Sequence, residues 1–105
     1  MKRYEARAFG MVFVWKDGKR RELAPRLDLR NHSPTGFSWG YLGSGCAQLA
    51  LALLCDVLQD DERACRLYQR FKVQAIATVN RDSKFEMTDA QVLEHVAAIE
   101  KEAIR

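Results

Sequence analysis

The residues with the clearest chemical potential lie where a polar loop meets an apolar segment. A Gly-Ser-Gly triplet precedes a run of Leu and Ala, and the free amides at the start of a helix can bind phosphate or another anion. The triplet lacks the downstream Lys-Ser/Thr of a P-loop, and glycines in such a place more often serve close packing of the loop. The residues that could line an anion or ligand site here are Asn31, His32, Gly43, Ser44, Gly45 and Gln48.

Catalytic chemistry has less support. His32 could act as a base, but one histidine in a polar loop is usually solvated or caps the backbone. The motifs HExxH, GxSxG and GxGxxG are absent, and Leu42 stands where a nucleophile elbow around Ser44 would need glycine. We therefore predict no catalytic residue and a protein that is not an enzyme.

The chain has three cysteines and two histidines, and these limit the metal and redox chemistry that it could support. Cys46, Cys55 and Cys65 form no CxxC motif, and only His32 and His95 could join them around an ion. An odd number of cysteines, with no secretion signal at the start, favours reduced thiols packed as small apolar groups. We predict no metal site, no cofactor and a cytoplasmic location.

The charge of the chain is uneven and suggests a second type of site. The net charge is +3, but residues 1–30 carry +5 and residues 31–105 carry −2. A basic surface of this kind could bind nucleic acid or an acidic partner, although charges on an edge strand also prevent aggregation. Both interpretations stay open. The candidate interaction residues are Trp15, Arg20, Arg21, Trp39, Tyr41, Arg63, Arg66 and Arg70.

The segment Ala47–Leu58 organises the chain. It is apolar at nearly every helical position, contains no Gly or Pro, and is too short to span a membrane. It therefore predicts a buried central helix, with Ser44 as its N-cap. The preceding segment, 37–41, alternates aromatic with small residues and predicts a short extended stretch with its rings on one face.

A β-hairpin is predicted near the N-terminus. Asp17-Gly18 is a strong two-residue turn signal between strands at 11–15 and 19–23, which places Trp15 opposite Arg20. A further strand is expected within 3–9. Because both faces of the hairpin carry apolar residues, the helices should cover one of them. Residues 26–30 alternate Leu with charged residues and predict an extended segment.

Two more helices are expected after the central one. Asp60 can cap a helix whose apolar stripe includes Leu67 and Phe71, and Thr88 with Gln91 forms a capping box for the last helix. A short edge strand should lie within 83–87. The resulting prediction is a single α+β domain, residues 1–105. In it, an N-terminal antiparallel sheet of two to four strands packs against three helices, with a buried central helix.

A long motif resembles a small family of bacterial and phage proteins known only as a domain of unknown function. Cys46 departs from the family pattern, which has Pro at that place. The resemblance implies a bacterial, phage or mobile-element origin and supplies no activity. The matching residues are Asn31, His32, Ser33, Pro34, Thr35, Gly36, Phe37, Trp39, Gly40, Tyr41, Gly43, Ser44, Gly45, Ala47 and Gln48.

Three functions follow as expectations. The first is a small non-enzymatic module that binds a protein, for example as an inhibitor or adaptor acting on a host protein. The second is a nucleic-acid-binding accessory protein that uses the basic hairpin and the arginines of the second helix. The third is a phosphate or nucleotide site at the Gly-Ser-Gly helix start. No membrane association is expected, a homodimer is possible, and the oligomeric state stays open.

Overall fold

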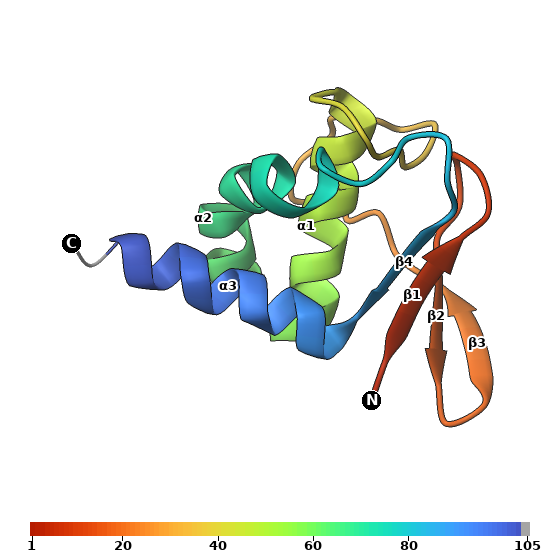
Figure 1. Ribbon diagram of the computed structural model, residues 1–105, viewed down its shortest axis with the longest axis horizontal. Helices are drawn as coiled ribbons and strands as arrows, with labels where there is room; N and C mark the ends of the chain where they lie inside the picture. The colour runs from red at the N-terminus through yellow and green to blue at the C-terminus, as the bar shows by residue number, and fades with distance from the viewer. Residues whose placement is uncertain (104–105) are drawn as a thin grey trace.

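The computed structural model describes residues 1–103 and has the predicted α+β fold, with a sheet and three α-helices (Figure 1). The strands are β1 (Arg3–Ala6), β2 (Phe13–Lys16), β3 (Lys19–Glu22) and β4 (Phe85–Thr88). They form one antiparallel sheet in the order β3-β2-β1-β4, so β3 and β4 are its edges. β4 overlaps the edge strand expected from the sequence at 83–87 and ends one residue later.

The β2–β3 hairpin has the predicted turn and register. Asp17 and Gly18 have φ values of 53° and 77°, and positive φ at both central residues is the signature of a type I′ turn. This turn matches the twist of the two strands and places Trp15 opposite Arg20 and Phe13 opposite Glu22. The prediction made from the Asp-Gly pair is confirmed.

The helices all lie on one side of the sheet (Figure 1). They are α1 (Ser44–Leu58), α2 (Asp61–Phe71) and α3 (Asp89–Ala103), and a π-helical turn, η1 (Lys72–Ile76), extends α2. α1 contacts α2, η1 and α3, and it is buried at every residue from Gly45 to Cys55. The prediction of a buried central helix is confirmed. Within residues 1–103, none of the helices combines the length and apolar character that a membrane span requires.

Two of the three predicted helix starts are confirmed and one is wrong. The Asp60 carboxylate accepts a hydrogen bond from the Arg63 amide at 3.1 Å. Thr88 and Gln91 exchange backbone-to-side-chain bonds of 2.9 and 3.1 Å, as a capping box does. At α1, however, Gly43 is the N-cap and no side chain caps the helix. A Cβ at position 43 would approach the Tyr41 ring to 2.2 Å, so this cap position favours glycine.

The expectation of an extended segment at 26–30 is wrong. Arg26 has a φ of 59°, and its carbonyl accepts hydrogen bonds from the amides of Leu29 and Arg30, which makes a turn. The Arg26 guanidinium holds Asp28, two residues on, at 3.1 Å. The ion pair between Arg26 and Asp28 favours a turn over a strand. The alternation of Leu with charged residues did not reveal it.

The aromatic segment is extended at only one point. Phe37 forms an isolated two-hydrogen-bond bridge with Gly10, at 2.8 and 2.9 Å. Phe37, Ser38 and Trp39 are all buried, whereas Tyr41 is partly exposed. Burial alone does not test whether the rings share one face, so that part stays a prediction, and the Phe9 ring lies near both Trp39 and Tyr41. The segment runs through the interior above the start of α1, and no single face of it is exposed.

Candidate functional site

The two faces of the sheet differ sharply. The inner face lies under the helices and is apolar, with Tyr4, Val12, Val14, Phe85 and Met87 buried. The outer face carries the side chains that alternate with these, and no helix covers it (Figure 1). Phe13 and Trp15 lie side by side on this outer face and are only partly buried. An uncovered sheet face with two aromatic rings is the first candidate site.

A shallow groove of about 440 Å³ runs across this outer face. Its apolar floor is formed by Phe13, Trp15 and Met11, and the Met11 side chain is 51% exposed. Charged groups surround this floor: three cations face one carboxylate. The charged residues that line the groove are Arg7, Arg20, Lys84 and Glu5.

Cations lie directly over the two rings. The Arg20 guanidinium lies 4.4 Å from the centre of the Phe13 ring, and that of Arg3 lies 5.8 Å from the centre of the Trp15 ring. The indole Nε1 of Trp15 donates a hydrogen bond of 2.8 Å to the Glu5 carboxylate. These contacts fix the rings in position, so the face is preorganised.

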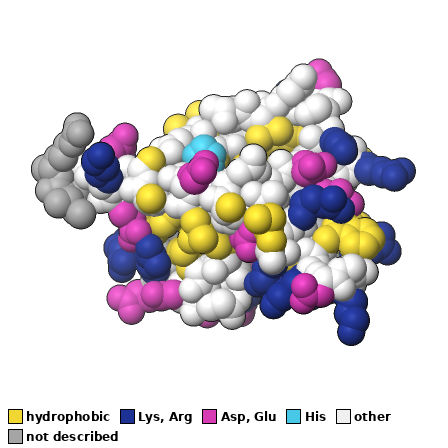
Figure 2. Space-filling model, turned by 60° about the horizontal axis from the view of Figure 1, so that its bottom comes forward, with side chains coloured by type: hydrophobic (Ala, Val, Ile, Leu, Met, Phe, Trp, Pro, Cys, Tyr) yellow, Lys and Arg dark blue, Asp and Glu magenta, His cyan; other side chains and the backbone are white. Residues whose placement is uncertain are grey.

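The charge around this region is visible on the surface. Figure 2 shows Lys and Arg side chains around a hydrophobic patch at the right-hand end of the molecule, the end that the sheet occupies in Figure 1.

The hairpin residues Arg20 and Arg21 point to opposite faces of the sheet, and Arg21 is the one on the inner side. Its side chain donates a hydrogen bond of 2.7 Å to Asp56. Of these two predicted interaction residues, only Arg20 lies on the outer face.

In this structure the glycines of the Gly-Ser-Gly triplet allow close packing against neighbouring side chains. A Cβ at Gly43 would approach the Tyr41 ring to 2.2 Å, and a Cβ at Gly45 would approach the Ser38 hydroxyl to 2.2 Å. The Ser38 hydroxyl is 3.0 Å from that of Tyr41, so the buried Ser38 already has a partner. Ser44 is exposed at the edge of a pocket of about 350 Å³. Close packing accounts for both glycines without a ligand.

Gln48 is a structural clip. Its amide oxygen accepts bonds from the amides of His32 and Ser33 at 2.8 and 3.1 Å. Its amide nitrogen donates to the carbonyls of Pro25 and Arg30 at 2.6 and 3.0 Å. Gln48 is fully buried and all four of its hydrogen-bonding positions are used. It holds the loop at 25–33 to the core helix and has no group left for a ligand.

The two remaining predicted ligand residues, and the predicted interaction residues Trp39 and Tyr41, are not aimed at one point. His32 Nε2 lies 2.8 Å from the Tyr68 hydroxyl, on α2, while Asn31 is exposed on the loop. Trp39 is fully buried, and its Nε1 donates to the Ser83 carbonyl at 3.0 Å. Tyr41 is partly exposed and lies under the Arg81 guanidinium, 5.0 Å from the ring centre.

The arginines predicted on the second helix are largely paired. Arg63 forms a two-point ion pair with Glu100, and Arg70 pairs with Glu102 at 2.5 Å. Both carboxylates belong to α3. Arg66 is exposed. The second helix therefore contributes much less free positive charge than its three arginines suggest from the sequence.

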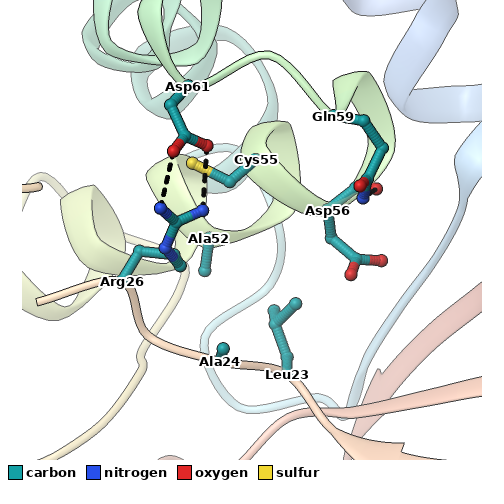
Figure 3. A pocket seen from close by; sticks show the side chains of 8 residues that line it. All are labelled: Leu23, Ala24, Arg26, Ala52, Cys55, Asp56, Gln59 and Asp61. Atoms are coloured by element: carbon teal, nitrogen blue, oxygen red, sulfur yellow. Dashed lines mark hydrogen bonds and ion pairs between the residues drawn. The ribbon is translucent and has the colours of Figure 1, made fainter. Parts of the chain in front are cut away.

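A polar pocket of about 380 Å³ lies at the C-terminal end of α1 and was not anticipated (Figure 3). Arg26 crosses it and binds Asp61 through two hydrogen bonds of 2.7 and 2.9 Å, as the dashed lines show. Hydrogen bonds to Asp61 and then Asp28 raise the pKa of Arg26, and those same bonds lower the pKa of both carboxyl groups. Arg26 is therefore neutralised by its two carboxylate partners and offers the pocket no free positive charge.

Asp56 is the most highly connected carboxylate beside this pocket. It accepts hydrogen bonds from Tyr4 at 2.6 Å, Arg21 at 2.7 Å and Lys2 at 3.3 Å. Burial alone would raise the pKa of Asp56, but the bonds from Tyr4 and Arg21 and the charge of Lys2 outweigh it and leave the pKa below its ordinary value. Burial, followed by the bond to Asp56, raises the pKa of Tyr4. The partners are more than 30 residues away along the chain, which is why no local pattern revealed the cluster.

The thiols do not form a reactive centre. Cys46, Cys55 and Cys65 are free, and burial raises the pKa of Cys55 to about 11. A thiol with such a pKa is almost wholly protonated at neutral pH and is a poor nucleophile. Among residues 1–103, no three His, Cys, Asp or Glu side chains gather where they could hold a metal ion.

Comparison with known proteins supplies a family and no activity. A family model described as "Family of unknown function (DUF6166)" matches residues 4–98, a range that contains the motif between Asn31 and Gln48. This match confirms the resemblance to a domain of unknown function. No curated protein and no solved structure shows significant similarity to the chain.

Proposed function

The chain belongs to the family of unknown function DUF6166, and from its geometry we propose that it is a small non-enzymatic module that binds a partner protein on the outer face of its sheet. The observation that carries the proposal is the uncovered groove floored by Phe13, Trp15 and Met11. Trp, other aromatic residues, Met and Arg are the residues that protein interfaces favour, and Trp and Arg contribute most to their binding energy.

The groove also suggests the chemistry of the partner. Three cations and one carboxylate line an apolar floor, so the best fit is an apolar side chain flanked by carboxylates. Because Arg20 and Arg3 already hold the rings in place, binding would cost little ordering of side chains. The proposed role is that of an inhibitor or adaptor acting on a host protein in the cytoplasm of a bacterium, and the resemblance to phage and mobile-element proteins supports it.

The test compares an aromatic residue on the outer face of the sheet with an exposed apolar residue on α3. The immobilised chain captures proteins from a bacterial lysate, and each captured protein is then purified and titrated against variants. Trp15→Ser should weaken binding of the true partner by at least about tenfold, since a central Trp is a typical hot spot. Leu93→Ser, on α3 and 48% exposed in the parent, should leave affinity unchanged. A captured protein that binds both variants as tightly as the parent contradicts the proposal.

Nucleic acid is the second candidate, favoured by one observation. Flat rings beside arginines are also the arrangement on which single-stranded bases stack, with the phosphates held by cations. Filter binding of a labelled single strand at several salt concentrations distinguishes the two. Retention that falls steeply with salt and is lost in Trp15→Ser would favour nucleic acid over a protein partner.

A further inference from the structure

The two edges of the sheet are not equivalent. At β4 the Thr88 amide is already bonded to the Gln91 side chain, and α3 begins at the next residue. At β3 all four residues, Lys19 to Glu22, are exposed. The β3 edge is therefore the more open of the two to another strand.

The register of the hairpin shows which backbone groups face this edge. The Leu23 amide donates to the Val12 carbonyl at 2.8 Å, so Val12 and Leu23 form a hydrogen-bonded pair. Because such pairs alternate along an antiparallel ladder, Arg21 is bonded inward to β2, whereas the backbone N–H and C=O of Arg20 and Glu22 point outward. Two residues thus offer four unpaired backbone groups in the correct spacing for a new strand.

We infer that this edge pairs with β3 of a second copy of the chain, antiparallel and centred on Arg21, so that two sheets join into one of eight strands. In this register Arg20 of each copy lies directly opposite Glu22 of the other on the outer face. Two favourable cross-strand pairs result from one two-fold axis.

Neighbouring registers are disfavoured by charge. Only registers that bring residues 20 and 22 into the ladder can use the outward-facing groups. Centring the axis on Arg20 would oppose that arginine to itself and Lys19 to Arg21. Centring it on Glu22 would oppose that carboxylate to itself. The order Lys-Arg-Arg-Glu is therefore self-complementary at the Arg21 register and repulsive at the other two.

The axis does bring the two Arg21 residues together, on the inner side of the sheet. Each Arg21 is paired with its own Asp56, at 2.7 Å, and this pairing reduces their repulsion. The same axis is perpendicular to the sheet, so both outer faces point the same way and the open aromatic surface is doubled. Pairing of the edges does not depend on what that surface binds.

The experiment is a charge-reversal cycle measured by analytical ultracentrifugation over a wide concentration range. Arg20→Glu and Glu22→Arg should each weaken self-association at least tenfold, because each places like charges opposite each other. The double variant R20E/E22R should restore it. An equimolar mixture of the two single variants should also associate, since one edge is then acidic and the other basic.

Two controls keep the result interpretable. Glu22→Pro removes an outward-facing amide and no bond within the fold. The variant should therefore be folded by circular dichroism and monomeric by ultracentrifugation. Arg66→Glu, on the exposed side of α2, should leave association unchanged. A parent chain that stays monomeric at millimolar concentration, a double variant that does not recover, or growth into open-ended polymers would each overturn the inference.

Discussion

The inner and outer faces of the sheet are built from alternate residues of the same strands, yet they behave as two different surfaces. On β2, Val14 faces the helices and is buried, while its neighbours Phe13 and Trp15 face outward and are only partly buried. Among the described residues, every buried side-chain N or O atom has a hydrogen-bond partner. On the outer face, rings and cations remain within reach of solvent or a partner.

This contrast shows that apolar character alone does not identify the core. Both faces of the hairpin contain apolar residues, so the sequence indicates that one must be covered but not which one. In the structure the aliphatic residues are buried in one core with the apolar helix α1, whereas the outer rings lie under the guanidinium groups of arginines. Large residues that a monomer leaves uncovered are where binding should be sought.

The largest expected effect compares one aromatic residue from each face. Tyr4→Ala, on the inner face, should lower the free energy of unfolding by about 3–5 kcal/mol, because it leaves a cavity and removes a bond to Asp56. Trp15→Ala, on the outer face, should cost about 1 kcal/mol. Urea unfolding followed by circular dichroism measures both. Equal losses would mean that the outer face is as much a part of the core as the inner one.

The next effect tests whether polar groups under the helices matter as much as apolar ones. Gln48→Leu should cost on the order of 3 kcal/mol, since it leaves two amides and two carbonyls of the 25–33 loop without partners. Gln69→Leu, at an exposed site, is the matched control and should change stability by less than about 0.5 kcal/mol. Thermal and urea unfolding report the difference, and an unaffected Gln48→Leu would contradict the role of the clip.

A smaller effect depends on pH and on Asp56. The pKa of this carboxyl group is lower in the folded chain than in the unfolded one, so its contribution is present above the unfolded pKa of about 3.9 and is lost as the pH falls through the folded value. Asp56→Asn should destabilise the protein by about 2 kcal/mol at pH 7. The variant should also lose less stability than the parent between pH 5 and pH 2. Parallel pH profiles would show that the cluster is not the source.

The smallest effect distinguishes two helix starts. Asp60→Ala should cost about 1 kcal/mol, because the carboxylate accepts a bond from the Arg63 amide. Ser44→Ala should stay within about 0.5 kcal/mol, because Ser44 is exposed and does not cap α1. Unfolding curves for both variants provide the comparison, and a costly Ser44→Ala would restore the cap predicted from the sequence.

Local signals predicted much of the fold. The Asp17-Gly18 turn, the Thr88–Gln91 box and the apolar run after Ala47 each act within a few residues, and the structure has all three. Signals failed where a side-chain contact decides, whether its partner is near or distant in the chain. The cap of α1 is set by the Tyr41 ring two residues before Gly43, and the turn at Arg26 is held by Asp28, two residues on, and by Asp61 across 35 residues.

The candidate sites follow the same rule. Trp15 and Arg20 were identified because a two-residue turn fixes their register, so their pairing across β2 and β3 could be predicted. The Asp56 cluster could not, since Lys2, Tyr4 and Arg21 reach it only after the sheet has packed on α1. The glycines beside Ser44 carried a signal for close contact, and sequence alone does not distinguish contact with a ligand from contact with a neighbouring ring.

The two tryptophans give the protein two separate fluorescent reporters. Trp39 is enclosed, with Phe9 edge-on at 4.9 Å, so its emission should shift to longer wavelength only when the chain unfolds. Trp15 lies on the open face, hydrogen-bonded to Glu5, so quenchers and bound molecules should reach it in the native state. Replacing each in turn with Phe would therefore yield one variant that signals docking and another that signals denaturation.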